Sequence, residues 1–464
     1  MHLQEIFMSK KSYTRLLIST FITGLTFSTA IQAAPYDLID LGALGDGDAF
    51  SFAINNLNEV TGTSEGTIVL EDDIDPDNPP DLCADNINRV FCTHAFLFTN
   101  SAMVDLGDLG LSNSHGLGIN DDSVVVGFGI VPTINADNEI IATQETALIS
   151  FSGAQVVAIP FPLDLDLAAN TQPRQRALDI SNNRLVVGYT LFRKFDDEGA
   201  SNTLIQPYVY DYDNDSLSII PLFSNEIARS GSARAINSSG VVVGWASSEE
   251  VNNPPHALRW DPASPELSVD LGTFGGFTSA AWAINDNGII VGTSDTSIEF
   301  NTNESIAFIY DASLATPLIR IPEFSEQEEF KFSVARDINN NNQVVGTAQF
   351  STAATNGNTA FMYDYNTGSL INLNDMVDCS LNWELYNATG INDAGYITGT
   401  GVFEGKSRSF MLIPTADTTP TDCTEIRRAA RDQVRRDIND GAGSIGFLSL
   451  LLGSLVLWRR KKVN

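Results

Sequence analysis

Carboxylate clusters are the residues of this chain whose types and spacing best suit chemistry. Residues 71–77 read Glu-Asp-Asp-Ile-Asp-Pro-Asp, and residues 211–215 read Asp-Tyr-Asp-Asn-Asp. Carboxylates at alternate positions match the oxygen ligands of calcium, although neither segment continues into the glycine and glutamate of an EF-hand loop. The first segment is therefore a calcium candidate or an acidic solvated loop. The second aligns with residues 261–264 and 364–368, which favours a turn between strands.

Histidines give little support to nucleophilic catalysis. Past residue 33 the chain has three, of which His94 and His256 occupy the same repeat position and are expected to be structural. No serine elbow and no cysteine nucleophile accompanies His115, although a triad is assembled in space and not by spacing. Two carboxylates could cleave glycosides, as in some propellers, but the sequence singles out no pair. We therefore assign no catalytic residue, no cofactor and no metal ligand.

Four cysteines indicate an oxidising compartment. By proximity, Cys83 pairs with Cys92 and Cys379 pairs with Cys423, although four cysteines allow three connectivities. No Cys-x-x-Cys pair and no neighbouring histidine pair is present, so zinc binding is disfavoured.

Aromatic residues are candidates for sugar stacking as well as for packing. Four of them lie inside repeat strands and are expected in the core: Trp260, Trp282, Phe361 and Tyr363. Two others, Trp383 and Phe403, lie near the joins between repeat elements, where packing is favoured and sugar stacking is the alternative.

A twelve-residue signature that returns seven times positions all of these residues. Each copy has an isoleucine eight positions before a closing glycine, as in AWAINDNGIIVG at residues 281–292. The isoleucines are Ile54, Ile119, Ile180, Ile236, Ile284, Ile338 and Ile391, and the glycines are Gly62, Gly127, Gly188, Gly244, Gly292, Gly346 and Gly399. Small and apolar residues lead into a polar turn and then a β-branched run, which predicts a β-hairpin.

Each turn has its own chemistry. The isoleucine is followed by asparagine, or by Ser181 in one copy, whose side chain can hydrogen-bond the backbone. Three positions later the hairpin needs a residue that tolerates positive φ. Those residues are Asn58, Ser123, Arg184, Gly240, Gly288, Asn342 and Gly395, of which Ser123 and Arg184 fit least well.

Two further strands follow each hairpin, one of the form small-apolar-aromatic and one like VDLGTFGG at residues 269–276. The last hairpin lacks the second of these strands, but residues 36–45 supply a copy ahead of the first hairpin. Pairing the two ends would close a ring and remove exposed sheet edges. Four strands in each of seven units, about 56 residues long, predict an all-β, seven-bladed β-propeller over residues 34–414. A β-solenoid, with about 20 to 30 residues per coil, is the alternative.

The repeat resembles the extracellular HAF repeat of largely uncharacterised bacterial envelope proteins. The motifs concerned are His94-Ala95-Phe96, the AIN hairpins and the DLG strands, over residues 36–414. The resemblance implies a repeat fold and an envelope location, and it implies no activity.

Both ends of the chain carry targeting patterns. Residues 1–33 have a basic start, an apolar stretch and a small-residue site, which predicts a secretory signal peptide; a retained anchor is the alternative. Residues 415–441 are read as a linker with a basic helix that carries Arg427, Arg428, Arg431, Arg435 and Arg436. A solvated stalk is favoured for this helix, and contact with anionic lipid is the alternative.

Residues 442–464 are predicted to be a short transmembrane segment ending in basic residues that include Arg459 and Arg460. This tail resembles the GlyGly-CTERM sorting signal, which implies cleavage by a rhomboid-type protease and delivery to the cell surface or medium. The paired glycine is replaced by Gly441-Ala442-Gly443, and a plain anchor facing the periplasm is the alternative.

The formal net charge of −32 argues against nucleic acid as a partner, since phosphate binding needs a basic surface. We therefore predict an exported envelope or surface protein that binds a polysaccharide, a matrix component or another envelope protein, and that depends on export and tail-processing machinery. A carbohydrate-active propeller enzyme, a glycoside hydrolase or lyase using channel carboxylates, is the alternative.

Overall fold

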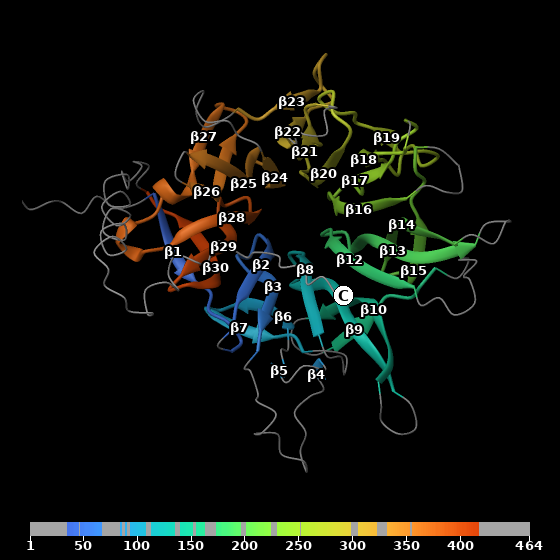
Figure 1. Cartoon of the computed structure of the whole chain (residues 1–464), viewed down its shortest axis with the longest axis horizontal. Helices are drawn as coiled ribbons and strands as arrows, with labels where there is room; N and C mark the ends of the chain where they lie inside the picture. The colour runs from blue at the N-terminus through green and yellow to red at the C-terminus, as the bar shows by residue number, and fades with distance from the viewer. Residues whose placement is uncertain are drawn as a thin grey trace, which may run out of the picture. The chain divides into compact units, whose positions relative to one another are not determined.

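The computed structural model describes residues 35–45, 47–66, 84–85, 89–90, 93–107, 113–134, 140–151, 155–162, 173–195, 201–223, 230–250, 252–297, 305–322, 332–352 and 355–416. All of them belong to one compact unit, Ala34–Asn464. They form seven antiparallel sheets of four strands each, arranged around a central axis (Figure 1). This arrangement confirms the predicted seven-bladed propeller.

The blades are numbered from the first hairpin, and their strands run from the axis outward. Blade 1 has β2 (Ala49–Ile54), β3 (Val60–Glu65), β6 (Thr93–Thr99) and β7 (Ala102–Asp105), and blade 2 has β8 (Asn113–Ile119), β9 (Val124–Ile134), β10 (Ile140–Phe151) and β11 (Gln155–Ala158). Blade 3 has β12 (Arg174–Ile180), β13 (Leu185–Phe195), β14 (Ser201–Asp211) and β15 (Ser216–Ile219), and blade 4 has β16 (Gly231–Ile236), β17 (Val242–Ser247), β18 (Pro255–Trp260) and β19 (Val269–Asp270).

The remaining blades follow the same plan. Blade 5 has β20 (Ser279–Ile284), β21 (Ile290–Asp295), β22 (Ser305–Tyr310) and β23 (Leu318–Arg320), and blade 6 has β24 (Ser333–Ile338), β25 (Gln343–Thr352), β26 (Thr355–Asp364) and β27 (Ser369–Asn372). Blade 7 has β28 (Glu384–Ile391), β29 (Ile397–Phe403), β30 (Lys406–Pro414) and β1 (Tyr36–Asp40). Two 3-10 turns, Leu373–Asp375 and Cys379–Leu381, precede β28, and β4 (Ala84–Asp85) pairs with β5 (Arg89–Val90) outside the blades.

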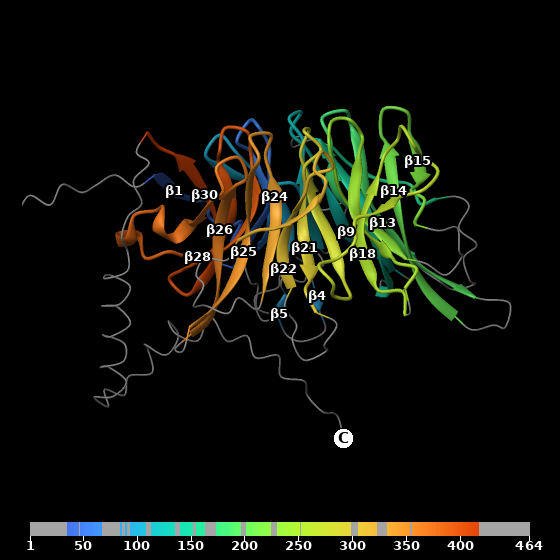
Figure 2. The same ribbon diagram turned by 90° about the horizontal axis from the view of Figure 1, so that it is seen from above.

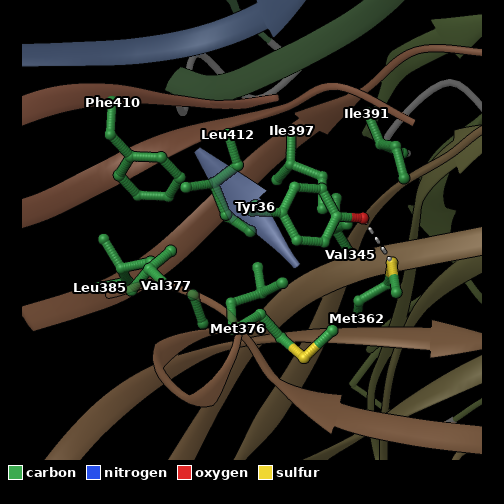
Figure 3. Close-up of a cluster of buried hydrophobic side chains, with 13 residues drawn as sticks. Tyr36, Val345, Met362, Met376, Val377, Leu385, Ile391, Ile397, Phe410 and Leu412 are labelled. Atoms are coloured by element: carbon green, nitrogen blue, oxygen red, sulfur yellow. Dashed lines mark hydrogen bonds between the residues drawn. The ribbon is translucent and has the colours of Figure 1, made fainter. Parts of the chain in front are cut away.

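Ring closure uses the displaced strand, as predicted. The innermost strands of successive blades contact one another around the whole ring, including β2 with β28. Strand β1 pairs with β30 in antiparallel register from Tyr36 opposite Pro414 to Asp40 opposite Phe410. Figure 3 shows Tyr36 inside the core of this last blade, where its hydroxyl donates to Met362 Sδ at 3.7 Å. The two ends of the propeller are therefore held together by backbone pairing and by shared apolar packing.

The two faces of the ring differ in their connections. The turns after the innermost strands and the turns before the outermost strands lie on one face, which we call the hairpin face. The second and fourth strands of each blade end at the other face, which we call the loop face (Figure 2). All seven predicted turn residues have positive φ, between 59° at Ser123 and 81° at Gly395. Even the two poorly suited residues, Ser123 and Arg184, adopt the required conformation.

The closing glycine of the signature is explained by close backbone approach. At Gly62 an added Cβ would overlap the carbonyl oxygen of Phe50 in the neighbouring strand, and the same overlap recurs at the closing glycine of every blade. A side chain at this position would force the two inner strands apart. The repeat keeps glycine here because the backbones leave no room for a Cβ.

The core lies between neighbouring blades. Phe361 and Tyr363, buried in the cluster between blades 5 and 6, are core residues as predicted, and Trp260 packs against the cluster between blades 3 and 4. Among the described residues, no helix is long and apolar enough to cross a bilayer. The predicted signal peptide, basic helix and tail, including Gly441, Gly443, Arg459 and Arg460, lie outside the described residues.

Candidate functional site

A β-bulge in the innermost strand of every blade supplies the lining of the central channel. The pairing register skips one residue two positions before the signature isoleucine in all seven blades. A bulge leaves its extra residue unpaired and redirects its side chain. The seven skipped residues all line one channel cavity: Phe52, Leu117, Leu178, Arg234, Trp282, Arg336 and Thr389.

At the hairpin face the channel ends in a ring of asparagines. The buried Asn55 donates from Nδ2 to the carbonyl oxygen of Asn120 at 3.0 Å. Five equivalent bonds join five more pairs of neighbouring blades, running from Asn120, Asn237, Asn285, Asn339 and Asn392. Only Ser181 has no side-chain amide to continue the ring. Each asparagine also accepts backbone N–H groups of its own turn, so this mouth is a structural collar.

A second, exposed ring lies just outside the collar. The backbone N–H of Asp286 donates to Asn340 Oδ1 at 2.9 Å, and the N–H of Asn340 donates to Asp393 Oδ1 at 2.8 Å. The same contact recurs between four other pairs of neighbouring blades. In this ring too, the side-chain oxygens already accept backbone N–H groups of a neighbouring blade.

Further inside the channel, toward the loop face, the cavity has a volume of about 380 Å³. Its wall is divided by chemistry. Phe52, Leu117 and Leu178 come from blades 1 to 3, whereas Arg234, Trp282 and Arg336 come from blades 4 to 6. The cavity therefore presents an apolar side and a cationic side to whatever occupies it.

The cationic side is a stack of two guanidinium groups on one indole. The Cζ atoms of Arg234 and Arg336 lie 4.0 Å and 4.4 Å from the centroid of Trp282. The buried Nε atoms of both arginines and Nε1 of Trp282 have no hydrogen-bond partner among the described residues. Burial lowers the pKa of Arg234 to about 10, to which Arg336 adds, and burial also lowers the pKa of Arg336. Both side chains remain cations at neutral pH.

Two carboxyl groups, Asp179 and Asp337, lie in the same cavity. Asp179 accepts the N–H of Ile180 at 2.8 Å and, from the next blade, that of Ile236 at 3.0 Å. Asp337 is held in the same way by Ile338 and by Ile391 of blade 7. Burial raises the pKa of Asp179 to about 7 and that of Asp337 to about 6, against the lowering effect of these N–H groups. The two groups brace neighbouring blades and titrate close to neutral pH.

His115 belongs to a second polar cluster, between blades 2 and 3. Its ring stacks on Phe128 at 4.5 Å between centroids, and Arg176 lies over the same phenylalanine at 4.1 Å. Arg176 donates from Nε to Glu145 at 2.8 Å. Burial lowers the pKa of His115 to about 4, and Arg176 adds to that effect. His115 is therefore neutral at physiological pH, and Thr63 Oγ1 lies 3.0 Å from its Nδ1.

The other two histidines have equivalent contacts, as their shared repeat position predicts. His94 Nδ1 lies 2.8 Å from Asp105, and His256 Nδ1 lies 2.8 Å from Asp270. Each aspartate belongs to the DLG motif of its blade and also accepts a backbone N–H, from Gly107 or Gly272. The histidine and the DLG aspartate thus connect the two outer strands of a blade.

The acidic segment at residues 211–215 forms the predicted turn, between β14 and β15. Asp211 accepts the backbone N–H of Asp213 and of Asn214, both at 3.1 Å, so its carboxylate closes the turn. Within the described ranges, no group of three or more potential metal-ligating side chains is present. The calcium candidate at residues 71–77 lies outside these ranges.

The rim of blade 7 carries the remaining aromatic pair. Trp383 stacks on Phe403 with centroids 5.2 Å apart, and its edge meets Phe410 at 6.4 Å. Nearby, Cys379 is disulfide-bonded. Cys83, Cys92 and Cys423 lie outside the described residues, so both predicted pairings stay predictions.

The prediction that Trp282 belongs to the core is wrong. Its strand alternation would bury it, but the bulge turns it into the channel. Sequence reasoning also missed Arg234, Arg336, Asp179 and Asp337. A signal was present: the residue before the signature isoleucine is alanine or glycine in five copies and aspartate in two. The residue two positions before the isoleucine is charged in only two copies, where it is Arg234 or Arg336.

The fold and the lined channel define the chain as a seven-bladed β-propeller. Its sequence belongs to the family described as "Protein of unknown function (DUF3466)", whose model matches residues 105–259 and 274–461. These matches lend no support to the HAF-repeat or GlyGly-CTERM resemblance. A search of the curated proteins found no match.

Solved structures of other propellers align over most of the chain at low identity. The Dos1 propeller is 11% identical with a TM-score of 0.39, covering 82% of this chain and 95% of its own. TolB from Acinetobacter baumannii is 12% identical with a TM-score of 0.37, covering 71% and 78%. A gluconolactonase from Xanthomonas campestris is 9% identical with a TM-score of 0.35, covering 83% and 92%.

Proposed function

We propose that this protein is an exported envelope or surface propeller that binds a polysaccharide, a matrix component or another envelope protein through its central channel. The observation that carries the proposal is the pair of cations in the cavity wall. Arg234 and Arg336 stack on Trp282 inside the cavity, and neither forms an ion pair with a described residue. Hydrogen bonds to charged groups are among the stronger ones, so a ligand with acceptor atoms would bind favourably.

Volume supports the same proposal. Ligand cavities usually have about 300–1,000 Å³ and combine apolar walls with a few polar groups. The channel cavity, at about 380 Å³, has this composition and falls at the small end of the range. It suits a small ligand or the end of a longer chain.

A carbohydrate-active enzyme remains the second candidate, because Asp179 and Asp337 now supply a pair of carboxyl groups in one cavity. Their raised pKa values would suit proton transfer near neutral pH. Against this role, both oxygens of each carboxyl group already accept a backbone N–H. Bracing of the ring accounts for these bonds without catalysis.

One experiment separates the two candidates. The full-length chain, purified in detergent, is applied to a panel of neutral and acidic polysaccharides with and without calcium, while retention and newly released sugar ends are recorded together. We expect retention without released ends. Release that is lost in D179N and D337N would establish the enzyme. If the chain shows no retention and no release, both candidates are removed.

A further inference from the structure

The cationic wall of the channel cavity has a ligand chemistry of its own. We propose that Arg234 and Arg336 bind the carboxylate of a uronic acid, the terminal sugar of an acidic polysaccharide, while Phe52, Leu117 and Leu178 cover the apolar face of its ring. This proposal rests on the proposed binding function and names its ligand class.

Charge is the first argument for an anionic group. The chain as a whole has a formal net charge of −32, yet two partly buried cations lie together here without an ion-pair partner in the described structure. Two arginines outside the cavity do form ion pairs: Arg176 bonds Glu145, and Arg259 bonds Asp261 at 2.8 Å. A buried cation without an anion is unfavourable, and a ligand carboxylate would supply the missing charge.

Geometry is the second argument. Trp282 stacks against each guanidinium, and the Nε atoms of both are covered. The terminal Nη groups have no hydrogen-bond partner among the described residues, so they are the donors that a ligand would meet. Guanidinium edges match carboxylate oxygens in a two-bond arrangement, and such charged bonds are among the stronger ones. The stacked pair is therefore organised for a planar anion before any ligand arrives.

The opposite wall argues for a sugar ring rather than a small free acid. Phe52 is 37% exposed, although it lies on an innermost strand. Leu117 and Leu178 continue this wall in blades 2 and 3. An aromatic and aliphatic wall suits the C–H face of a pyranose, whose carboxylate would lie across the cavity. The cavity volume limits this ligand to a single sugar or a chain end.

Asp179 and Asp337 are the acidic groups in the same cavity, and they make the pH dependence informative. Because burial raises their pKa values to about 7 and about 6, both change from mostly ionised to mostly neutral as the pH falls from 8 to 5.5. Arg234 and Arg336 stay charged over that range, and Tyr189, which faces Arg234, stays neutral because burial raises its pKa. Uronate binding should therefore strengthen at the lower pH, as long as the ligand remains ionised.

The test is a calorimetric titration of the full-length chain with D-galacturonate, D-glucuronate, neutral D-galactose and a tripeptide with a free C-terminal carboxylate. Variants are R234Q, R336Q and the double variant, with R259Q on the outside of blade 4 as the matched control. Because a charged hydrogen bond contributes about 1.5–3 kcal/mol, each single variant should weaken uronate binding at least about tenfold. R259Q should bind like the unaltered chain, and thermal melts confirm that every variant is folded.

Three outcomes would overturn the proposal: equal affinity for galactose, unchanged uronate affinity in the folded double variant, or binding of the tripeptide without binding of either uronate. Retention of polysaccharides by the folded double variant would leave the binding function standing and refute only this site. If the unaltered chain neither binds a uronate nor retains any polysaccharide, both proposals fail.

Discussion

The two polar regions of the channel differ in how their hydrogen bonds are used. At the hairpin face, each asparagine side chain bonds backbone groups on both sides. Its amide N–H donates to a carbonyl oxygen of the next blade, and its amide oxygen accepts N–H groups of its own turn, as at Asn392. In the cavity, the donors of Arg234, Trp282 and Arg336 have no such partners in the described residues. Both regions are built from the same innermost strands, a few residues apart.

This difference separates residues that hold the ring from residues that are available to a ligand. The collar is polar because seven blades must be joined around an axis, where backbone groups would otherwise lack partners. The cationic wall joins blades 4 to 6 by stacking on Trp282, without hydrogen bonds between them. Substitutions in the collar should therefore lower stability, and substitutions in the wall should lower binding.

The largest effect is expected for N392A. Asn392 is 4% exposed and donates to Asn55 O at 3.0 Å and to Asn58 Oδ1 at 2.8 Å, while it accepts the N–H groups of Ala394 and Tyr396. Removing its amide leaves buried backbone groups without hydrogen-bond partners, so we expect a loss of about 3 kcal/mol in unfolding free energy. Chemical denaturation measures the loss.

N287A is the matched control, because Asn287 lies on the same face and its amide donates to Asn340 O at 2.9 Å from an exposed position. We expect it to cost less than about 1 kcal/mol. Equal losses in the two variants would mean that the collar does not hold the ring.

The next effect concerns pH. Burial raises the pKa of Asp179 from its ordinary value of 3.8 to about 7 in the folded chain. Between about pH 4 and pH 7 the folded state therefore binds a proton that the unfolded state does not. The contribution of Asp179 to stability therefore falls as pH rises from about 4 to 7. D179N lacks this term, and its stability relative to the unaltered chain should rise by about 2 kcal/mol between pH 5 and 8. Melting curves at several pH values measure the trend, with D286N as the exposed control; parallel curves for D179N and the unaltered chain would contradict it.

R336M tests the other side of the comparison. Methionine replaces a partly buried cation that forms no ion pair in the described structure, so stability should stay constant or rise by about 1 kcal/mol. Polysaccharide retention should decrease at the same time. A loss of stability comparable with that of N392A would show that Arg336 supports the ring, and would remove the distinction between the two regions.

The smallest effect is expected for S181N, which adds an amide at the only position of the collar that lacks one. The new side chain could donate to the carbonyl oxygen of Asn237, the bond missing from the ring, and should stabilise by about 0.5–1 kcal/mol. S181A serves as the comparison, because it removes the serine hydroxyl, which accepts the N–H of Leu185 at 3.3 Å. The prediction would be contradicted if S181A had a higher denaturation midpoint than S181N.

The repeat made the fold predictable to the level of single turns. Asparagine after the isoleucine, positive φ at Asn58 and its equivalents, and closure by residues 36–40 all follow from local chemistry repeated seven times. The cavity was not predictable in the same way. Its lining depends on a bulge, and alternation assigns Trp282 to the wrong side when the bulge is not known. Asp179 and Asp337 could not be distinguished from the other acidic residues, 58 in all, because sequence spacing does not show which carboxyl groups the ring brings together.

Closure by β1 also determines how the ring is presented to its surroundings. Strand β30 ends at the hairpin face, where Tyr36 lies opposite Pro414 and the N–H of Thr415 donates to Pro35 O at 2.9 Å. The chain thus enters and leaves the propeller at a single point on its rim. The asparagine collar therefore lies on the same side of the ring as both points where the chain joins the propeller, and the loop face lies on the opposite side.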